Sequence, residues 1–217
     1  MCGIAGLLGL GPETRSVSDT AVLRGMADAL ARREGRSGPC ASASVHPRSL
    51  ACGGAAHALG GRHVIVVTGE IYNHLDLRKA LTTEGAKIAW KGHSDTETLL
   101  AAITHWGLDA ALRKSTGMFA LALWDKDTRT LSLARDRTGE KPLHVAILEK
   151  AVAFASELQA FHAVPGFTPS LDPQVLRGFV STAAVADDSC ISASVRKLQP
   201  GTILTIGAAG GTMEQRV

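Results

Sequence analysis

Residues 118–156 read MFALALWDKDTRTLSLARDRTGEKPLHVAILEKAVAFAS. This stretch holds four apolar segments, MFALALWD, TLSLARD, LHVAIL and AVAFAS, which are separated by turn-like polar residues. Each segment has the length and the composition of a β-strand. Because the links between them are short, consecutive strands are expected to pair antiparallel. The stretch therefore predicts a run of antiparallel strands.

The rest of the chain adds strands and helices on both sides of this stretch. Short apolar or β-branched runs predict strands, and apolar residues at helical spacing predict helices. Further strands are expected at 2–8, 63–68 and 201–206, and helices at 19–33, 74–84, 95–105, 108–114, 157–163 and 172–180. This order favours helices that cover packed antiparallel sheets over a parallel doubly wound sheet. The expected fold class is therefore α+β.

Composition narrows the class of protein and its partners. The 217 residues are 45% hydrophobic and 20% charged, which is ordinary for a globular protein. The net charge of +3 is spread along the chain, so a nucleic-acid partner has little support. No apolar run reaches the roughly 20 residues that span a bilayer, and the apolar start lacks a basic flank. We therefore expect a cytoplasmic protein without a membrane partner, in which Cys2, Cys40, Cys52 and Cys190 are reduced.

Two stretches have little regular pattern. Residues 34–61 are rich in Gly, Ala and Ser and show no clear period, so they are expected to form a long loop. Residues 207–217 are Gly-rich and are expected to form a linker-like tail. A metal site in the loop is a weak alternative, because structural zinc sites use a closely spaced Cys pair that is absent here. Its ligands would be Cys40, His46, Cys52 and His57.

The chain starts with Met-Cys-Gly. Removal of Met1 would leave Cys2 with a thiol nucleophile and a free α-amine on one residue. That amine has a reference pKa of about 7.7–8.0, so part of it is neutral near pH 7.5 and can act as a base. The alternative is a small buried cysteine in a strand. The dipeptide alone does not separate these two interpretations.

Two motifs lie at the ends of predicted elements: one follows an apolar strand, and the other precedes an apolar helix. In the first, residues 68–73 (TGEIYN), Gly69 would allow a backbone N–H to approach a ligand, and Glu70 could accept hydrogen bonds from an amide or ammonium group. Its structural alternative is a strand-to-helix turn in which Asn73 caps the helix. In the second, residues 92–97 (GHSDTE), Ser94 or Asp95 is expected to cap the following helix, and Ser94 with Glu97 fits the spacing of a capping box. The alternative makes Asp95 the counter-ion of an ammonium group.

A third motif is the charged turn ARDRTGEKPL, residues 134–143. A turn of this composition between two strands has a structural explanation, in which Arg and Asp side chains pair around it. The turn is therefore not expected to carry chemistry.

Six segments, taken in order, resemble one family. They are MCGIAG, GEIYNH, HSDTE, GMFALALWD, ARDRTGEKPL and FASEL. Together they are similar to the class II glutamine amidotransferase domain, and most similar to the N-terminal half of glutamine-dependent asparagine synthetases. The resemblance covers residues 1–33 and about 62–206.

The resemblance implies the fold of the N-terminal-nucleophile hydrolases, a four-layer α/β/β/α sandwich of two antiparallel sheets. It implies that the Cys2 thiolate attacks the side-chain amide of glutamine, that ammonia leaves, and that water then releases glutamate. The catalytic residues implied are Cys2, Thr68 and Gly69, and the substrate-binding residues are Arg48, Leu50, Gly69, Glu70 and Asp95.

Thr68 departs from the family motif, which normally has Asn in this place. That Asn side chain donates one of the two hydrogen bonds to the oxyanion, and losing one such donor typically costs about 10²–10³ in rate. This departure keeps a second function open, in which the domain binds a partner or a ligand and is catalytically weak or inactive. A third option is a self-processing hydrolase of the same fold, which Glu70 and Asp95 disfavour because they suit an amino-acid ammonium group.

The resemblance also sets the expected partners. Residues 1–206 are expected to form the glutaminase domain, and the synthetase domain is absent from this sequence. Glutamine is the expected substrate, and a synthetase domain in cis or in trans would use the ammonia, most often to make asparagine from aspartate. The glutaminase reaction needs no cofactor, so ATP and Mg²⁺ are expected only in the synthetase domain. Assembly as a homodimer is left open.

Overall fold

The computed structural model describes residues 3–10, 18–31, 42–45, 48–52, 56–59, 61–186, 189–207 and 211–217. Only the backbone is described for residues 18–20 and between residues 42 and 59.

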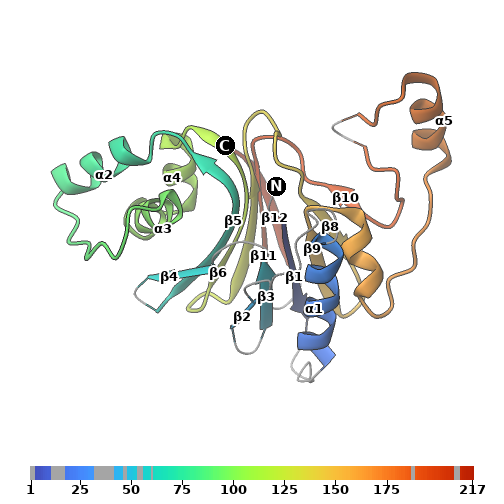
Figure 1. Ribbon diagram of the computed structural model, residues 1–217, viewed down its shortest axis with the longest axis horizontal. Helices are drawn as coiled ribbons and strands as arrows, with labels where there is room; N and C mark the ends of the chain where they lie inside the picture. The colour runs from blue at the N-terminus through green and yellow to red at the C-terminus, as the bar shows by residue number, and fades with distance from the viewer. Residues whose placement is uncertain are drawn as a thin grey trace.

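Among the described residues, two six-stranded antiparallel sheets lie face to face (Figure 1). The first sheet has the order β10-β8-β9-β1-β3-β2, and the second has the order β12-β11-β7-β6-β5-β4. The strands of the first sheet are β1 (Ile4–Gly9), β2 (Ser42–Val45), β3 (Arg48–Cys52), β8 (His144–Ile147), β9 (Ala151–Ala155) and β10 (Arg196–Lys197). Those of the second are β4 (Ala56–Leu59), β5 (His63–Ile71), β6 (Gly117–Asp125), β7 (Thr130–Arg135), β11 (Thr202–Gly207) and β12 (Thr212–Arg216).

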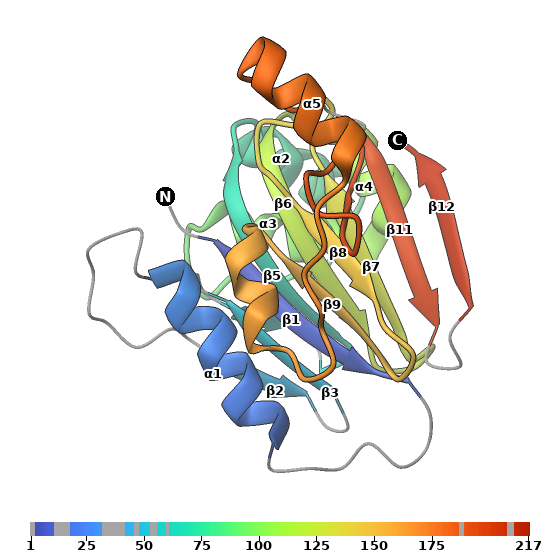
Figure 2. The same cartoon turned by 90° about the vertical axis from the view of Figure 1, so that its right-hand side faces the viewer.

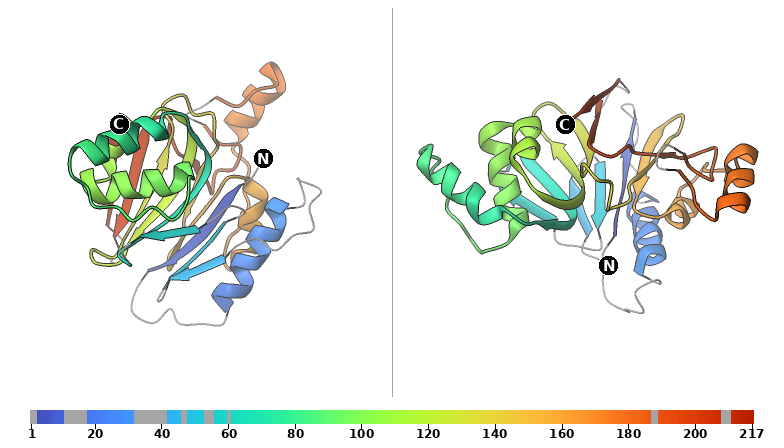
Figure 3. Two further views of the ribbon diagram at one scale, coloured as in Figure 1. Left: turned by 60° about the vertical axis from the view of Figure 1, so that its left-hand side comes forward. Right: turned by 90° about the horizontal axis from the view of Figure 1, so that it is seen from above.

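Three apolar layers hold the sheets and helices together. The central layer lies between the sheets, where side chains such as Ile4, Val66 and Phe154 are buried. The outer face of the first sheet packs against α1 (Ser18–Ala31) and the 3-10 helix η2 (Leu158–Ala163), as Figure 2 shows. The outer face of the second sheet packs against three helices, visible in Figure 3: α2 (His74–Thr83), α3 (Asp95–Trp106) and α4 (Leu108–Lys114). The expected four-layer α/β/β/α sandwich is therefore confirmed.

The expected long loop at residues 34–61 is wrong for its described part. Residues 42–45, 48–52 and 56–59 form β2, β3 and β4, of which β2 and β4 are edge strands and β3 lies between β1 and β2. Their Ala- and Ser-rich sequences contain one β-branched residue, Val45, and no Phe, Tyr or Trp, so hydrogen bonding to the neighbouring strands decides their conformation. Cys40 and His46 lie outside the described residues. The tail also differs from the expected linker, because 212–216 pair with β11 as strand β12.

The strands of the stretch 118–156 form where they were expected, but β7 and β8 do not pair with each other. They belong to different sheets, so the chain crosses from one sheet to the other over residues 136–143. The expectation that all consecutive strands pair is therefore wrong at this link. Charged side chains at the crossing form hydrogen bonds with backbone groups. Arg135 donates to the carbonyl oxygens of Lys141 and Leu198, each at 2.8 Å.

The buried carboxylate of Asp136 is the centre of this crossing. It accepts hydrogen bonds from the backbone N–H groups of Phe119, Thr138, Glu140 and Lys141 at 3.0–3.3 Å, and from the Thr138 hydroxyl at 2.9 Å. Burial by itself raises the pKa of this carboxyl, but these hydrogen bonds outweigh burial and hold the pKa below its ordinary value. The ionised carboxylate therefore stabilises the fold.

We predict that Asp136→Asn lowers the free energy of unfolding at pH 7 by about 1–3 kcal/mol, because an amide cannot accept all of these bonds. Since the folded pKa is lowered, the contribution of the carboxylate is present above the unfolded pKa of about 3.9 and is lost as the pH falls through the folded value. The difference between wild type and variant in urea unfolding should shrink below about pH 4. Asp127→Asn, at an exposed turn residue, is the matched control and should change stability by less than about 0.5 kcal/mol. An equal loss in both variants would contradict the prediction.

Candidate functional site

The start of β1 and the end of β5 lie at the same end of the sandwich (Figures 1 and 2). Side chains alternate along β5, and Val64 and Val66 belong to the layer between the sheets. Thr68 and Glu70 continue that alternation, so they face the same layer as Ile4 of β1. Thr68 is buried and Glu70 is exposed, which marks the point where this layer opens to solvent.

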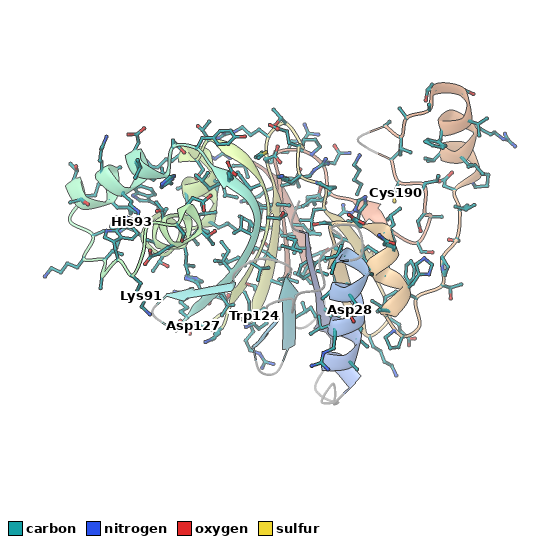
Figure 4. The ribbon with its side chains drawn as sticks, in the orientation of Figure 1. Asp28, Lys91, His93, Trp124, Asp127 and Cys190 are labelled. Atoms are coloured by element: carbon teal, nitrogen blue, oxygen red, sulfur yellow. The ribbon has the colours of Figure 1, made fainter. Side chains whose placement is uncertain are left out.

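Trp124 of β6 lies at the level of Val64 in this layer, and Figure 4 shows Trp124 at the end opposite to the start of β1. The side chain of Trp124 is buried.

Ser156 fixes the start of β1. The Ile4 N–H donates to the Ser156 hydroxyl at 3.0 Å, and the Ser156 N–H donates to the Ile4 carbonyl at 2.8 Å. A Cβ added to Gly3 would lie 3.3 Å from Leu30 and 3.4 Å from Ser156, so the chain is closely packed here as well. Cys2 lies outside the described residues. Ile4, two residues after Cys2, is held by two hydrogen bonds to Ser156. Ser156 belongs to the FASEL segment, but no role was expected for it from the sequence.

Gly69 adopts a backbone conformation that requires glycine. Its φ is +125°, and an added Cβ would overlap the carbonyl oxygen of Met118 on the neighbouring strand. Gly117, opposite Ile71, is equally confined, because a Cβ there would overlap the Glu70 carbonyl oxygen. The backbones of β5 and β6 therefore approach closely beside Glu70.

Asp95 ties the start of α3 to the end of β5. The Ser94 hydroxyl caps α3 by accepting a bond from the Glu97 N–H at 3.1 Å, so the predicted cap is confirmed. The Asp95 carboxylate accepts from the N–H of Ile71 at 2.8 Å and from the N–H of Thr96 at 2.7 Å. The structure thus brings Asp95 to the residue that follows Glu70.

The capping box expected at α3 is only half formed. The Glu97 side chain accepts bonds from the N–H groups of Lys91 at 2.6 Å and Gly92 at 3.0 Å instead of reaching back to Ser94. Arg78 of α2 donates to the Gly92 carbonyl at 3.0 Å and lies 4.0 Å from the ring centroid of Trp90. These contacts hold the segment before α3, on which Figure 4 labels Lys91 and His93.

Asn73 has a role other than the one that was expected. It occupies the N-cap position of α2, but its side chain makes no capping bond. Instead it accepts from the Thr116 N–H at 2.8 Å and donates to the Lys114 carbonyl at 2.9 Å. The side chain thus joins the turn after β5 to the segment before β6, a contact between residues more than 40 positions apart.

The backbone of Arg48 lies far from this end of the sandwich. β3 pairs antiparallel with β1, with Cys52 opposite Ile4 and Ser49 opposite Leu7. Arg48 is therefore about four residues along the strand from the level of Ile4, or about 13 Å. Leu50 lies opposite Gly6, midway along β1. The structure brings Thr68, Gly69, Glu70 and Asp95 together, whereas the backbone of Arg48 lies farther along the first sheet.

At the open end, Tyr72 lies near three carboxylates. Partial burial, followed by the charges of Glu140, Glu70 and Asp136, raises the pKa of the Tyr72 hydroxyl. The hydroxyl of Tyr72 is therefore neutral at physiological pH and can donate a hydrogen bond. Beside it lies a pocket of about 250 Å³, to which Tyr72, Thr116, Arg137 and Glu140 contribute.

The described residues contain no group of three or more His, Cys, Asp or Glu side chains arranged to hold a metal ion. Nor does the part of the chain that the structure describes include a helix with the length and apolar character needed to cross a membrane.

Comparison with known proteins agrees with this geometry. The family model described as "Glutamine amidotransferase domain" matches residues 1–216. The putative glutamine-hydrolysing asparagine synthetase of Mycobacterium tuberculosis (strain H37Rv) is 40% identical over 151 residues, which are 68% of this chain and 23% of the relative. Asparagine synthetase 1 of Bacillus subtilis is 30% identical over 223 residues, which cover 97% of this chain and 34% of the relative. The chain thus spans about a quarter to a third of these relatives.

Among solved structures, the glutamine phosphoribosylpyrophosphate amidotransferase of B. subtilis has a similar fold. The TM-score is 0.65 at 17% sequence identity, and the match covers 99% of this chain and 49% of that chain. At this identity the likeness concerns the fold alone. The fold of the described residues, the family match over nearly the whole chain and the relatives at 30–40% identity agree with one another. This chain belongs to the glutamine amidotransferase domain family.

Proposed function

We propose that this domain hydrolyses glutamine to glutamate and ammonia, with Cys2 as the nucleophile. The observation that carries the proposal is the meeting of two strand ends at one opening. The start of β1, just after Cys2, is fixed by Ser156, and the end of β5 presents Gly69 and Glu70 at the same end of the sandwich.

The chemistry needs only groups that this chain supplies. The α-amine of a processed Cys2 takes the thiol proton, and the thiolate attacks the side-chain carbonyl carbon of glutamine. The negative charge that develops on the oxygen is stabilised by the N–H of Gly69. The proton returns to the leaving nitrogen, ammonia departs, and a thioester remains. Water then attacks the thioester, glutamate is released, and the thiol is restored.

Thr68 is the second candidate donor to the oxyanion. It is buried on the face of β5 that points between the sheets. Its hydroxyl is shorter than the amide of the Asn that the family motif normally has here, and it donates in a different direction. Thr68 therefore supports slower turnover than an Asn would.

Glu70 and Asp95 are the candidates for binding the polar groups of the substrate. Glu70 is exposed at the opening, so its carboxylate is available to an ammonium group. The Asp95 carboxylate accepts hydrogen bonds from two backbone N–H groups, which fix its position. Its remaining lone pairs can accept further hydrogen bonds from a substrate. The substrate-binding roles of Arg48 and Leu50 remain expectations from family resemblance, and the strand register gives Arg48 no support.

Asparagine synthesis is the proposed use of the ammonia. The names of the curated relatives join glutamine hydrolysis to asparagine synthesis, and this chain matches about a third of the B. subtilis protein. A synthetase domain, in cis or in trans, would then bind ATP and Mg²⁺ and use ammonia to amidate aspartate. We place this reaction in the cytoplasm, and we assign residues 1–206 to the glutaminase domain.

The test of the nucleophile starts with mass spectrometry, which should find Met1 removed. Treatment with an electrophilic glutamine analogue should then label Cys2 stoichiometrically, and glutamate should be released from glutamine. Cys2→Ala should abolish both labelling and turnover, whereas Cys190→Ala, at the half-buried cysteine near η2, should keep both. A processed Cys2 that neither labels nor turns over glutamine would refute the proposal and favour the binding module.

A further prediction concerns the hydrogen bonds to the oxyanion. Thr68→Asn should raise kcat for glutamine hydrolysis by about tenfold or more, because it restores the longer amide donor. Thr68→Val, which keeps the shape and removes the hydroxyl, should lower kcat or leave it unchanged. Steady-state kinetics of wild type and the two variants measures kcat. An Asn variant no faster than wild type would exclude a defect in the hydrogen bonds to the oxyanion.

Ser156 is expected to act as a positioning residue for the nucleophile. Ser156→Ala leaves the buried Ile4 N–H without its hydroxyl acceptor, which should cost about 1–3 kcal/mol in stability. It should also lower kcat more than it changes KM, because the start of β1 is no longer fixed. Ser132→Ala, at a comparably buried serine on β7, is the matched control, and it should lose stability without a change in kcat. Ser156→Thr keeps the hydroxyl and should recover kcat. Equal kcat values in Ser156→Ala and Ser132→Ala would show that Ser156 does not position the nucleophile.

A further inference from the structure

The segment that joins α2 to α3, residues 84–94, contains neither helix nor strand and ends directly before Asp95. Polar backbone groups in such a segment need hydrogen-bond partners from side chains or water. Two side chains supply partners here, Arg78 of α2 and Glu97 of α3. Both lie mostly inside the protein, with 13% of the Arg78 side chain and 5% of the Glu97 side chain exposed. The path of the chain toward Asp95 therefore depends on this pair.

The guanidinium group of Arg78 donates hydrogen bonds in several directions. It reaches the Gly92 carbonyl at 3.0 Å and the Ser94 carbonyl at 3.2 Å. Its Nε donates to the Thr98 hydroxyl at 2.7 Å, and that hydroxyl donates in turn to the Ser94 carbonyl at 3.1 Å. One face of the group lies over the Trp90 ring, 4.0 Å from the centroid. Lysine cannot replace such a planar fork, which stacks and donates at the same time.

Glu97 completes the arrangement and neutralises the guanidinium group. Its carboxylate accepts from the N–H groups of Lys91 at 2.6 Å and Gly92 at 3.0 Å, and one of its oxygens lies 3.4 Å from Nη2 of Arg78. An unpaired guanidinium group this close to the start of α3 would repel a bound ammonium group. Because Arg78 and Glu97 are paired, the negative charge of the Asp95 carboxylate remains available to a ligand.

Asp95 lies between the residues that this pair holds. The carbonyl of Ser94, just before it, is bound by Arg78, and the carboxylate of Glu97, two residues after it, is bound by the same guanidinium group. The Asp95 carboxylate accepts from the Ile71 N–H at 2.8 Å, which leaves lone pairs for a ligand at the opening. The direction of those lone pairs follows from the backbone before and after Asp95, and Arg78 fixes both sides.

We propose that Arg78 is a positioning residue that makes the site selective for the α-ammonium group of glutamine, because it holds the Asp95 carboxylate in place. The inference rests on the proposed function, in which Asp95 is a candidate for binding that group. Arg78 acts through Asp95 and does not itself contact the substrate. A change at Arg78 therefore weakens the binding of ligands that carry an ammonium group and leaves the chemistry at Cys2 largely intact.

The test compares two ligands of the full natural protein, glutamine and 4-carbamoylbutanoate, which is glutamine without its α-amino group. Calorimetry in a Cys2→Ala background gives a dissociation constant for each ligand without turnover. The ratio of the two constants measures the selectivity for the ammonium group. Because both constants are measured on the same protein, a partly unfolded sample lowers the number of sites without changing this ratio.

Arg78→Lys keeps the charge but lacks the fork, so it should lower the selectivity about tenfold, the effect of weakening one hydrogen bond to a charged group. The dissociation constant for 4-carbamoylbutanoate should stay unchanged. In the protein with Cys2 intact, the same substitution should raise KM for glutamine while kcat changes little. Arg62→Lys is the matched control and should keep the selectivity of wild type. Arg62 pairs with Asp125 at 2.7 and 3.0 Å just before β5, at the end of that strand away from the opening.

Two more variants test whether Arg78 acts through Asp95. Glu97→Gln removes the charge that neutralises the guanidinium group, and it should weaken the binding of glutamine but not that of 4-carbamoylbutanoate. In an Asp95→Asn background the selectivity should already be low. Arg78→Lys should lower it no further there, since the effects of coupled residues do not add.

Three results would overturn the inference. They are an equal weakening or loss of both ligands in Arg78→Lys, a selectivity equal to that of wild type, and effects of Arg78→Lys and Asp95→Asn that add. A natural protein that neither binds nor hydrolyses glutamine refutes the proposed function and this inference together. Glutamine that binds with a selectivity which Arg78→Lys leaves intact contradicts this inference alone.

Discussion

The apolar layer shared by the two sheets is the constraint on which the rest of the structure depends. Burial of side chains such as Ile4, Val66 and Phe154 holds the sheets face to face, at roughly 1.5–3 kcal/mol for each fully buried side chain. Trp124 is buried near one end of this layer, and at the other end Thr68 is buried while Glu70 reaches solvent. The position of the candidate site thus follows from the packing of the core.

Within that frame, hydrogen bonds between side chains and the backbone set the geometry of the site. Ser156 holds Ile4, Asp95 holds Ile71, and Asn73 joins the turns after β5 and before β6. Each of these side chains bonds to the backbone of an element remote in sequence. Such bonds to otherwise unsatisfied backbone groups fix positions more sharply than apolar contacts, since hydrogen bonds are directional.

Much of the fold could be predicted from local pattern. The β-branched run at 63–68 and the apolar runs after residue 118 became strands, and Ser94 became the expected cap, because these signals are local. What could not be predicted depends on distant partners. The bond from Arg135 to Leu198 spans 63 residues and accompanies the crossing between sheets, and β2 to β4 become strands through their neighbours. For the site, the motifs identified Gly69, Glu70 and Asp95, whereas the place of Arg48 depends on a strand register that no local pattern encodes.

The position of β1 within its sheet has a consequence for the order of folding. Strands β5, β6 and β7 are neighbours in the second sheet, and all three have been synthesised once residue 135 has been made. β1 pairs with β9, whose last residue is Ala155, so the first sheet needs contacts across about 150 residues. Contacts so distant in sequence form slowly, and synthesis at about 5–20 residues per second delays them further. The nascent chain can therefore pair the strands that carry Gly69 before β1 gains its partner β9, although β1 can pair with β3 earlier.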